Sequence, residues 1–513
     1  MSVFLKLRRV LRRRRGGETT GPCGSGPCAL TPSWTASIFA PPFLDLSILV
    51  WSVVPVKIQR RLSAAKLRPA IDQFLKLSGR KILSIDRGWN PADGTPVFTQ
   101  KGQYTTRGWT EWTQGFQYGC AILQYDMTGD EQFLELGRRQ TVDRMAAHVS
   151  HIGVHDHGFN NLSTYGNLRR LMREERIDHD PRELEFYELA IKLSGAVQAA
   201  RWTETAYGTG FIHSFNGPHS LFSDTIRSLR ILCLADQLGH VLMAEGDKAH
   251  NLLGRAIEHA ITTAHFNVYY GESRDTWDVE GRVVHESIFN TKDGNYRCPS
   301  TQQGYSAFST WTRGLSWILT GYAEQLEFFR TVKGSQIEPH GISKRKLVAM
   351  MERAAIASAE FHIENSFVDG IPFWDTGAPG VASFGRYTNT ASDPYNDVEP
   401  LDASAAAISA QGYLRLGNYL LAKGDQARGE RYRTAAFTIA EALLQEPYLS
   451  TSPKHQGITL HSIYHRPNNW DYVPRGRKIP CGESAMWGDY HTMELALLVK
   501  REAEGDIYPT FYS

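Results

Sequence analysis

Amphipathic stretches with helical spacing recur along most of this sequence and limit its fold more than any other feature. In each stretch apolar residues return at three- and four-residue steps, which produces one apolar face. The stretches are 62–78, 109–127, 131–150, 183–200, 224–242, 249–265, 309–330, 344–363, 401–423, 427–446 and 484–502, with a further one near 161–174. Strand alternation is scarce, and the best hairpin is 282–297, with Asp293-Gly294 as its turn. We therefore predict an all-α fold of helical hairpins packed in a ring or solenoid; no fixed-period repeat supports the common solenoids.

The first 57 residues differ from the rest in composition. A basic run, "LKLRRVLRRRR", precedes a segment rich in Gly, Pro, Ser and Thr, which is typical of disorder. An apolar segment follows, but Pro41, Pro42 and Asp45 interrupt it, and the uninterrupted run 46–54 is too short to span a bilayer. We interpret residues 1–57 as a poorly structured leader, with a membrane anchor as the alternative, and 58–513 as one helical domain.

Charge and cysteine usage narrow the function classes. The net charge is +2, which gives no electrostatic case for nucleic acid. Four of the six cysteines are scattered through the main body without metal-type spacing. This usage indicates buried thiols in a reducing compartment rather than a disulfide framework, so we expect a cytoplasmic protein. The 12 tryptophans and 22 tyrosines leave room for sugar-stacking sites beyond the core.

The stretch "CPSTQQGYSAFSTWTRGLSW", residues 298–317, is an unusual way to begin a helix. Ser309 or Thr310 is expected to cap the helix. Arg313 would then lie in the first turn, where the helix dipole disfavours a cation, so a functional partner for it is expected. Arg313 and Trp317 are four residues apart and share one helix face. A guanidinium suits a carboxylate, and an indole suits a pyranose ring. Together they predict a site for an acidic sugar.

Four further candidates carry both a functional and a structural interpretation. Asp156 in "HDHGFN" is a carboxylate among imidazoles, or an Asx turn, or part of a zinc site, although no recognised ligand spacing completes the last. Asp224 follows a polar loop and begins a helix, where an ordinary N-cap is the simpler interpretation. His285 stands alone in the predicted hairpin. Trp112 lies in an aromatic cluster at a polar helix start.

Several motifs together resemble one family. The stretch "TQQGYSAFSTWTRGLSW" is similar to the signature THQGYSxxSTWxRGxxW of unsaturated glucuronyl hydrolases, glycoside hydrolase family 88. The stretches "WTQGF", "HDHGF", "SDTIRSL", "PFWDTGAPG", "EPLDASAAAISAQGYLRL" and "MWGDYHTMELALL" also resemble the family, in its order, from about residue 100 to the C-terminus. The resemblance implies an (α/α)6 barrel and a glycosidase of polysaccharide and glycosaminoglycan breakdown that needs no metal or organic cofactor.

The resemblance also implies roles for individual residues. Asp224 matches the general acid/base and Asp156 the second essential aspartate. The residues that match the lining of the sugar site are Trp112, His285, Gln303, Arg313 and Trp317. The sequence departs from the family at Gln302, where histidine is common, and at Phe215, where tryptophan is expected. Arg227 and Arg230 are also unusual and suggest a sulfated or otherwise anionic partner sugar.

The implied reaction releases a Δ4,5-unsaturated uronic acid from lyase-generated oligosaccharides by hydration of the C4=C5 double bond. It requires one aspartate that is protonated at rest, and burial next to a second carboxylate raises an aspartate pKa. Asp224 with Asp156 would form such a pair. The alternatives are an unsaturated rhamnogalacturonyl hydrolase, a sugar epimerase that uses histidine bases, and a catalytically silent carbohydrate-binding ring. The sequence leaves the source glycan and the oligomeric state open, and no membrane partner is expected.

The composition of residues 1–57 generates a first prediction. A chain that begins near Lys57 should fold and turn over unsaturated uronates as well as the full chain does. Solubility, circular dichroism and turnover of the two chains compare them directly. An insoluble or inactive short chain beside an active full chain would mean that the leader is part of the domain.

Overall fold

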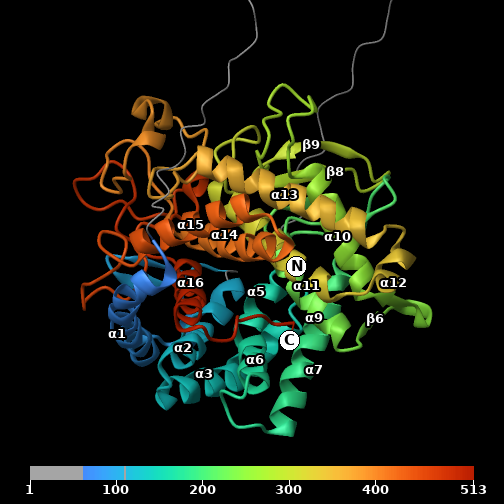
Figure 1. Cartoon of the computed structure of the whole chain (residues 1–513), viewed down its shortest axis with the longest axis horizontal. Coiled ribbons are helices and arrows are strands. Elements are labelled where there is room, and N and C mark those ends of the chain that lie inside the picture. The colour runs from blue at the N-terminus through green and yellow to red at the C-terminus, as the bar shows by residue number, and fades with distance from the viewer. Residues whose placement is uncertain (1–61, 109–110, 513) are drawn as a thin grey trace, which may run out of the picture. The chain divides into compact units, whose positions relative to one another are not determined.

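The computed structural model describes residues 62–108 and 111–512 (Figure 1). The predicted leader lies outside the described residues. The α-helices are α1 (Ala64–Gly88), α2 (Gln114–Thr128), α3 (Glu131–Arg144), α4 (Ala146–Val149), α5 (His157–Asn161), α6 (Asn167–Arg173), α7 (Pro181–Ala200), α8 (Thr225–Ser228), α9 (Arg230–Gln237), α10 (Leu252–Phe266), α11 (Thr312–Thr331), α12 (Gly334–Ile337), α13 (Lys344–Glu364), α14 (Ala403–Lys423), α15 (Gln426–Leu443) and α16 (Met486–Glu504). A π-helical segment, Leu162–Gly166, joins α5 to α6.

Strands are short and lie between helices. They are β1 (Phe98–Gln100), β2 (Gln103–Thr105), β3 (Trp202–Glu204), β4 (Gly210–Ile212), β5 (Ser220–Phe222), β6 (Val241–Met243), β7 (Ala249–Asn251), β8 (Glu286–Phe289) and β9 (Tyr296–Ser300). The predicted hairpin is confirmed as the antiparallel pair β8–β9, and β5 joins it on the other side of β8. Asp224 follows two residues after the end of β5, so this small sheet positions it.

Six helical segments form a closed inner ring. In chain order they are α2, then α5 with the π segment and α6, then α8 with α9, then α11, α14 and α16. Each segment packs against the next one, and α16 packs against α2 to close the ring. An outer helix, α1, α3, α7, α10, α13 or α15, precedes each inner segment. Five of these helices pack on the segment that they precede, whereas α10 packs on α9 and is linked to α11 by the hydrogen bond from the Tyr322 hydroxyl to the carbonyl oxygen of Ala260. The all-α prediction and the (α/α)6 barrel implied by the resemblance are both confirmed.

The inner helices approach closely because small residues lie at their crossings. Gly158 in α5 faces α8, and a Cβ atom added there would lie 2.1 Å from the carbonyl oxygen of Ser228. Gly115 in α2 faces α5, and its added Cβ would lie 2.2 Å from the carbonyl oxygen of Asn160. Neither position tolerates a side chain unless the backbone moves. These two contacts set how close α5 lies to its ring neighbours.

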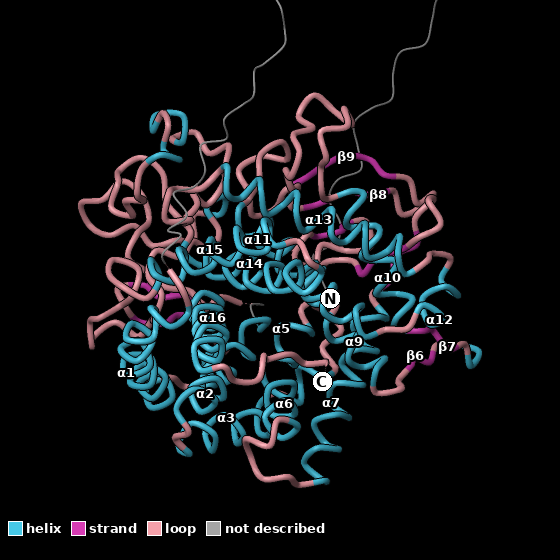
Figure 2. Tube along the Cα trace, viewed as in Figure 1, coloured by secondary structure: helices cyan, strands magenta, loops and turns pink. Residues whose placement is uncertain are grey.

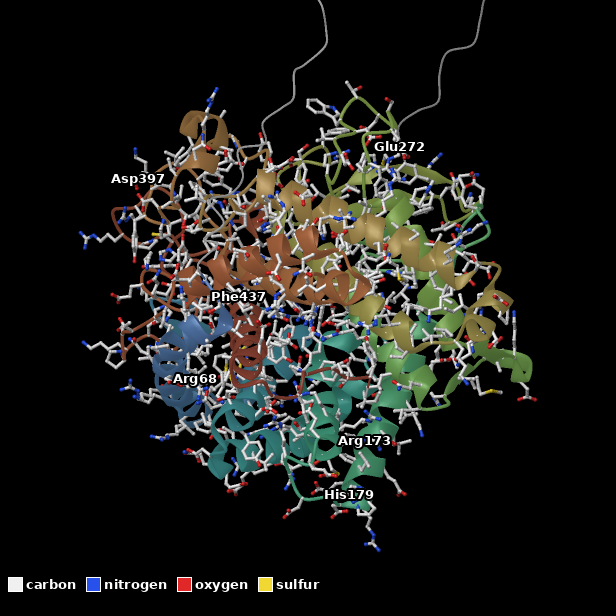
Figure 3. All side chains as sticks on the ribbon, in the orientation of Figure 1. Arg68, Arg173, His179, Glu272, Asp397 and Phe437 are labelled. Carbon is white, nitrogen blue, oxygen red and sulfur yellow. The ribbon has the colours of Figure 1, made fainter. Side chains whose placement is uncertain are left out.

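Long connections gather at one end of the ring. The connections into the inner segments are mostly long: 89–113 (described apart from residues 109–110), 145–156, 201–224, 267–311, 365–402 and 444–485. Those out of the inner segments are shorter on the whole: 129–130, 174–180, 238–251, 332–343 and 424–425. Figure 2 shows most loops along the upper edge of the view. In Figure 3 Glu272 and Asp397, from two long connections, lie near that edge, whereas Arg173 and His179 lie at the opposite end. The inner segments therefore begin at the end that carries the long loops.

A buried network of charges fills the centre of the ring. Arg227 pairs with Glu324 (Nε–Oε2 3.2 Å) and with Glu494 (Nη2–Oε2 2.8 Å), and Arg230 pairs with Glu324 (Nη1–Oε1 3.1 Å). Both arginine residues are fully buried. The suggestion that Arg227 and Arg230 contact an anionic partner sugar is therefore wrong, because their charges are already compensated inside the barrel.

Some local expectations also need correction. The N-cap of α11 is Trp311, and no side chain caps this helix, because the helix begins at Thr312 rather than at Ser309 or Thr310. Among the four described cysteines, Cys120, Cys233 and Cys481 are buried, but Cys298 is exposed. None of the helices in the described part of the chain has the length and apolar character needed to cross a membrane.

The crossing of α5 and α8 yields a stability prediction. Gly158→Ala should lower the free energy of unfolding by about 1–3 kcal/mol or more, because the new methyl group collides with backbone atoms of Ser228. Gly334→Ala is the matched control: its added Cβ meets only the flexible end of Glu338 at 3.7 Å. Urea unfolding of both variants measures the difference. Equal stability of the two variants would contradict the proposed close contact.

Candidate active site

A cavity of about 370 Å³ opens at the end of the ring where the inner helices begin. It is lined by Trp112, His151, Gly153, Val154, His155, Asp156, Phe159, Phe215, Asp224, Gln302, Gln303, Trp311, Arg313, Trp317, Tyr464, His465 and Trp470. Six of the seven residues implied by the resemblance are therefore brought together from distant parts of the chain. The seventh, His285, does not line the cavity but packs edge-on against Trp311, with ring centroids 4.6 Å apart.

Asp156 and Asp224 occupy the N-cap positions of α5 and α8, yet neither side chain makes a capping hydrogen bond. Other N-cap aspartates behave differently. Asp402 accepts hydrogen bonds from two backbone N–H groups of α14, and Asp180 does the same for α7. The simple N-cap interpretation of Asp224 is therefore wrong. Both carboxylates line the cavity instead, and their side chains are nearly buried.

His155 lies between the two carboxylates. Its Nε2 atom is 3.4 Å from Oδ1 of Asp224 and 3.7 Å from Oδ1 of Asp156. The imidazole stacks on Phe215 at a centroid distance of 6.0 Å and meets the edge of Phe222 at 5.5 Å. These rings restrict its orientation and keep Nε2 within 4 Å of a carboxylate oxygen of each aspartate, although neither contact meets the geometry of a hydrogen bond.

The three groups shift one another's protonation. Burial raises the pKa of Asp156 to about 6, with the nearby Asp224 adding to the rise and His155 opposing it. Burial also raises the pKa of Asp224, but His155 and His285 outweigh it and hold this pKa below its usual value. Burial lowers the pKa of His155, whereas Asp156 and Asp224 together raise it above the ordinary histidine value. Below about pH 6 the protonated aspartate of the free protein is thus Asp156, not Asp224.

His285 is held in a single tautomer. Its Nδ1 accepts hydrogen bonds from the backbone N–H groups of Gln302 (3.0 Å) and Gln303 (3.3 Å). Burial lowers the pKa of His285 to about 4, so the ring is neutral at ordinary pH. The proton therefore resides on Nε2, which is buried and has no hydrogen-bond partner among the described residues. Because His285 does not line the cavity, a role for this donor in binding a ligand stays a prediction.

Arg313 is buried and already engaged with the protein. Nη1 donates to Oδ2 of Asp402 (2.9 Å) and to the carbonyl oxygen of Ile463, and Nη2 donates to Oε1 of Gln303 (2.9 Å) and the carbonyl oxygen of Tyr464 (2.9 Å). These four acceptors account for all four Nη hydrogens. Direct binding of a sugar carboxylate by Arg313 stays a prediction. The observed contacts place Gln303 and the 463–464 segment against the cavity.

Aromatic rings form much of the wall. Trp112 stacks on Trp487 at a centroid distance of 5.1 Å, and Tyr464 packs on both Trp487 (4.9 Å) and Trp470 (5.2 Å). Trp317 lies deeper, buried against Phe159 at 4.8 Å.

Sequence reasoning did not single out Trp311, Tyr464, His465 or Trp470 as site residues. The signal that could have found the last three is the aromatic-rich stretch "YHRPNNWDY", residues 464–472, in the long loop before α16. For a metal, the described residues include no group of three or more His, Cys, Asp and Glu side chains placed to hold an ion.

No protein-family model matches the chain. Two proteins named unsaturated glucuronyl hydrolase are similar to it. The one from Formosa agariphila is 24% identical over 392 residues, which is 75% of this chain and 78% of the relative. The one from Bacillus sp. (strain GL1) is 25% identical over 452 residues, or 86% and 98% of the two chains. A protein from Streptococcus agalactiae named unsaturated chondroitin disaccharide hydrolase is 22% identical over 454 residues, or 87% and 94%.

Solved structures of unsaturated glucuronyl hydrolases are similar to this chain in fold. An unsaturated glucuronyl hydrolase described as specific for heparin aligns with a TM-score of 0.63 at 20% identity, over 86% of this chain and 100% of its own. The structure of the enzyme from Bacillus sp. GL1 aligns with a TM-score of 0.61 at 22% identity, over 84% and 96%. At such identity these structures establish the fold. With the sequence relatives, they confirm the resemblance that the motifs predicted.

The raised pKa of Asp156 generates a prediction about stability and pH. Its folded-state pKa, about 6, lies above the ordinary value of 3.8. Below pH 3.8 both states are protonated and Asp156 contributes nothing, but from about pH 4 to 6 the unfolded chain loses this proton first, so wild-type stability falls. Asp156→Asn should therefore gain about 1–3 kcal/mol relative to wild type between pH 4 and pH 6.5.

Chemical unfolding of both proteins at several pH values measures this difference. Removal of Asp156 should also lower the pKa of His155. The variant then loses stabilisation by charged His155 at low pH, which adds to its relative gain in stability as the pH rises. A difference that stays constant over this range would show that Asp156 ionises normally in the folded protein.

Proposed function

We propose that this chain, a relative of the unsaturated glucuronyl hydrolases, is a hydrolase that releases Δ4,5-unsaturated uronic acids from lyase-generated oligosaccharides by hydration of the C4=C5 double bond. One observation carries the proposal. Two aspartates at the N-cap positions of different inner helices make no capping hydrogen bond. Their carboxylates instead lie within 4 Å of one buried histidine, in a cavity lined by aromatic rings.

The proposed chemistry follows from the double bond. C4=C5 is part of a vinyl ether, so C4 accepts a proton and positive charge develops at C5 beside the ring oxygen. Water then adds to C5 and gives up a proton, the hemiketal opens, and the glycosidic linkage breaks. A single carboxyl group can serve as acid in the first step and as base in the second. We assign this role to Asp224 and the supporting role to Asp156.

The protonation pattern of the free protein bears on this assignment. Asp224 has a lowered pKa, so it is ionised before substrate binds. An unsaturated uronate brings a second negative charge into the cavity, and a nearby like charge raises the pKa of a carboxyl group. Substrate binding thus favours the protonated form of Asp224 at the step where a proton is needed. Asp156 supplies a neutral neighbour below about pH 6.

Neutral donors and aromatic faces support sugar binding. Trp112 offers an indole at the cavity wall, and His285 lies behind the wall, where it accepts hydrogen bonds from the backbone N–H groups of the lining residues Gln302 and Gln303. Direct contact between His285 and the sugar stays a prediction. Gln303 is oriented by Arg313, so we assign Arg313 a positioning role beside its charge. Trp317 supports the floor. A cavity of about 370 Å³ falls within the range of small-molecule sites.

The partner sugar is a separate question. Relatives are named for chondroitin disaccharides, and one solved structure is described as specific for heparin. Another, from Streptococcus agalactiae, is a complex with dGlcA-GalNAc6S. A panel of unsaturated disaccharides from chondroitin, hyaluronan, heparin and pectin, followed by loss of the ultraviolet absorbance of the double bond, identifies the preferred substrate. Turnover of unsaturated rhamnogalacturonan fragments alone would favour the rhamnogalacturonyl alternative.

Asp224→Asn tests the acid/base. The amide keeps the shape of the carboxyl group but cannot exchange a proton, so turnover should fall about a thousand- to ten-thousand-fold or more while substrate still binds. Asp425→Asn is the matched control, because Asp425 caps α15 and accepts a hydrogen bond from the backbone N–H of Arg428. The control should keep wild-type turnover. An active Asp224→Asn enzyme would refute the assignment.

Wild-type turnover in heavy-oxygen water tests the reaction itself. Hydration places the label at C5 of the uronate-derived keto product, whereas direct glycoside hydrolysis places it at an anomeric carbon. Mass spectrometry of the products distinguishes the two. Label confined to the anomeric carbon would refute hydration for this protein.

A further inference from the structure

The proton that Asp224 delivers has to come from a neighbouring group. Asp224 has to deliver a proton to C4, yet its pKa in the free protein lies below the usual aspartate value. Asp156 is the carboxyl group of the pair that is protonated below about pH 6. His155 can carry a proton and lies close to both carboxyl groups, since Nε2 is 3.4 Å from Asp224 and 3.7 Å from Asp156.

The surroundings of His155 favour a function in proton storage. The ring is 1% exposed and clamped by Phe215 and Phe222, so it cannot turn away from the carboxylates. A buried imidazole is ordinarily neutral, because burial disfavours its charge. Two carboxylate oxygens within 4 Å reverse that preference here. Nε2 and Oδ1 of Asp224 lie 3.4 Å apart, and both are buried without a hydrogen-bond partner among the described residues, so a proton on Nε2 faces an acceptor that the protein does not otherwise use.

Other titratable or charged groups near the ring come from every element around it. His285 immediately precedes β8, and His259 lies in α10. Burial lowers the pKa of His285 to about 4 and that of His259 to about 3, so neither adds charge at neutral pH. His213, after β4, has its pKa lowered to about 4 by burial. Arg201, after α7, is the remaining cation, and its guanidinium donates to the carbonyl oxygens of His213, Ile152 and Ser214. The carboxylates are thus the groups that stabilise a charged His155.

We propose that His155 stores the proton that Asp224 delivers to C4, a positioning role that acts through Asp224 and rests on the proposed function. When the anionic sugar enters, the Nε2–H bond of the imidazolium breaks and the proton passes to Oδ1 of Asp224, which leaves His155 neutral. Asp224 then gives this proton to C4. In the second half of the reaction Asp224 takes a proton from the attacking water and returns it to Nε2. The enzyme ends as it began, and the substrate has gained one water molecule.

The stored charge can be measured without any substrate. In the full chain with isotopically labelled histidine, nuclear magnetic resonance should show His155 titrating above the ordinary histidine pKa. The His155→Ala spectrum identifies its signal. In Asp224→Asn and in Asp156→Asn the pKa of His155 should fall, because both aspartates are ionised above about pH 6, where His155 titrates, and each substitution removes one of these charges. A His155 that is neutral down to low pH in the wild-type protein would overturn the proposal.

Chemical rescue separates proton storage from shape. His155→Ala should lose about a hundred-fold in kcat or more, while circular dichroism shows a retained helical fold. Added imidazole should restore a measurable part of this loss, because it fills the vacated space and carries a proton. Pyrazole has the same size and shape but stays unprotonated at neutral pH, so it should not rescue. Equal rescue by both would mean that His155 only fills space, and rescue by neither, with imidazole shown to bind, would also overturn proton storage.

His157→Gln is the control variant. His157 flanks Asp156 on the other side and is also buried, but its ring nitrogens contact Ser194 and the carbonyl oxygen of His151 instead of the carboxylates. This variant should keep the wild-type pH profile of kcat/KM, whereas His155→Gln should shift its alkaline limb. An unmoved limb in His155→Gln would contradict the proposal. Failure of the proposed function is recognised separately, because the wild-type protein would then be inactive on the whole disaccharide panel while the titration of His155 would still be observed.

Discussion

The candidate active site depends on one geometric constraint: all six inner segments of the ring begin at the same end. Long connections enter each segment there, so residues from 112 to 470 of the chain can meet in one cavity. The tight crossing at Gly158 brings α5 against α8 and thereby fixes the distance between Asp156 and Asp224. A ring of helices is a rigid support for such a pair, because each helix is held by two ring neighbours and by outer helices.

Burial gives the site its chemistry, and it demands compensation. Arg313 lies inside the wall and is neutralised by Asp402, while Arg227 and Arg230 are neutralised by Glu324 and Glu494 beneath the floor. Removing one partner of a buried ion pair typically costs about 3–5 kcal/mol, so these pairs resist change. Trp317 lies between the cavity and the buried charges beneath it. It lines the cavity, and the guanidinium of Arg227 lies 5.6 Å from its ring centroid.

The sequence predicted the helical fold well because helix periodicity is a local signal that tertiary packing only reinforces. The hairpin at β8–β9 was predictable for the same reason, from its Asp-Gly turn. What failed depended on packing between distant segments. Local propensity favoured a capping role for Asp224, but its side chain makes no capping hydrogen bond and lines the cavity instead. Charge alone suggested a ligand for Arg227, although Glu324 and Glu494, about 100 or more residues away, already neutralise it. Loop residues such as Tyr464 and Trp470 follow no periodic pattern, so only the folded chain brings them to the site.

The charge of the site follows from the same three groups and bears on how an anionic sugar can enter. Below about pH 6, Asp156 is neutral, and the positive charge of His155 offsets the negative charge of Asp224. The three groups then carry no net charge, so a uronate meets no repulsion. Two ionised carboxylates without the imidazolium would repel it, and in a buried cavity that repulsion is weakly screened. A pair of aspartates alone, as the sequence suggested, would have supplied a protonated acid but not this balance. The histidine between them allows one carboxylate to be ionised while the cavity stays open to a negatively charged substrate.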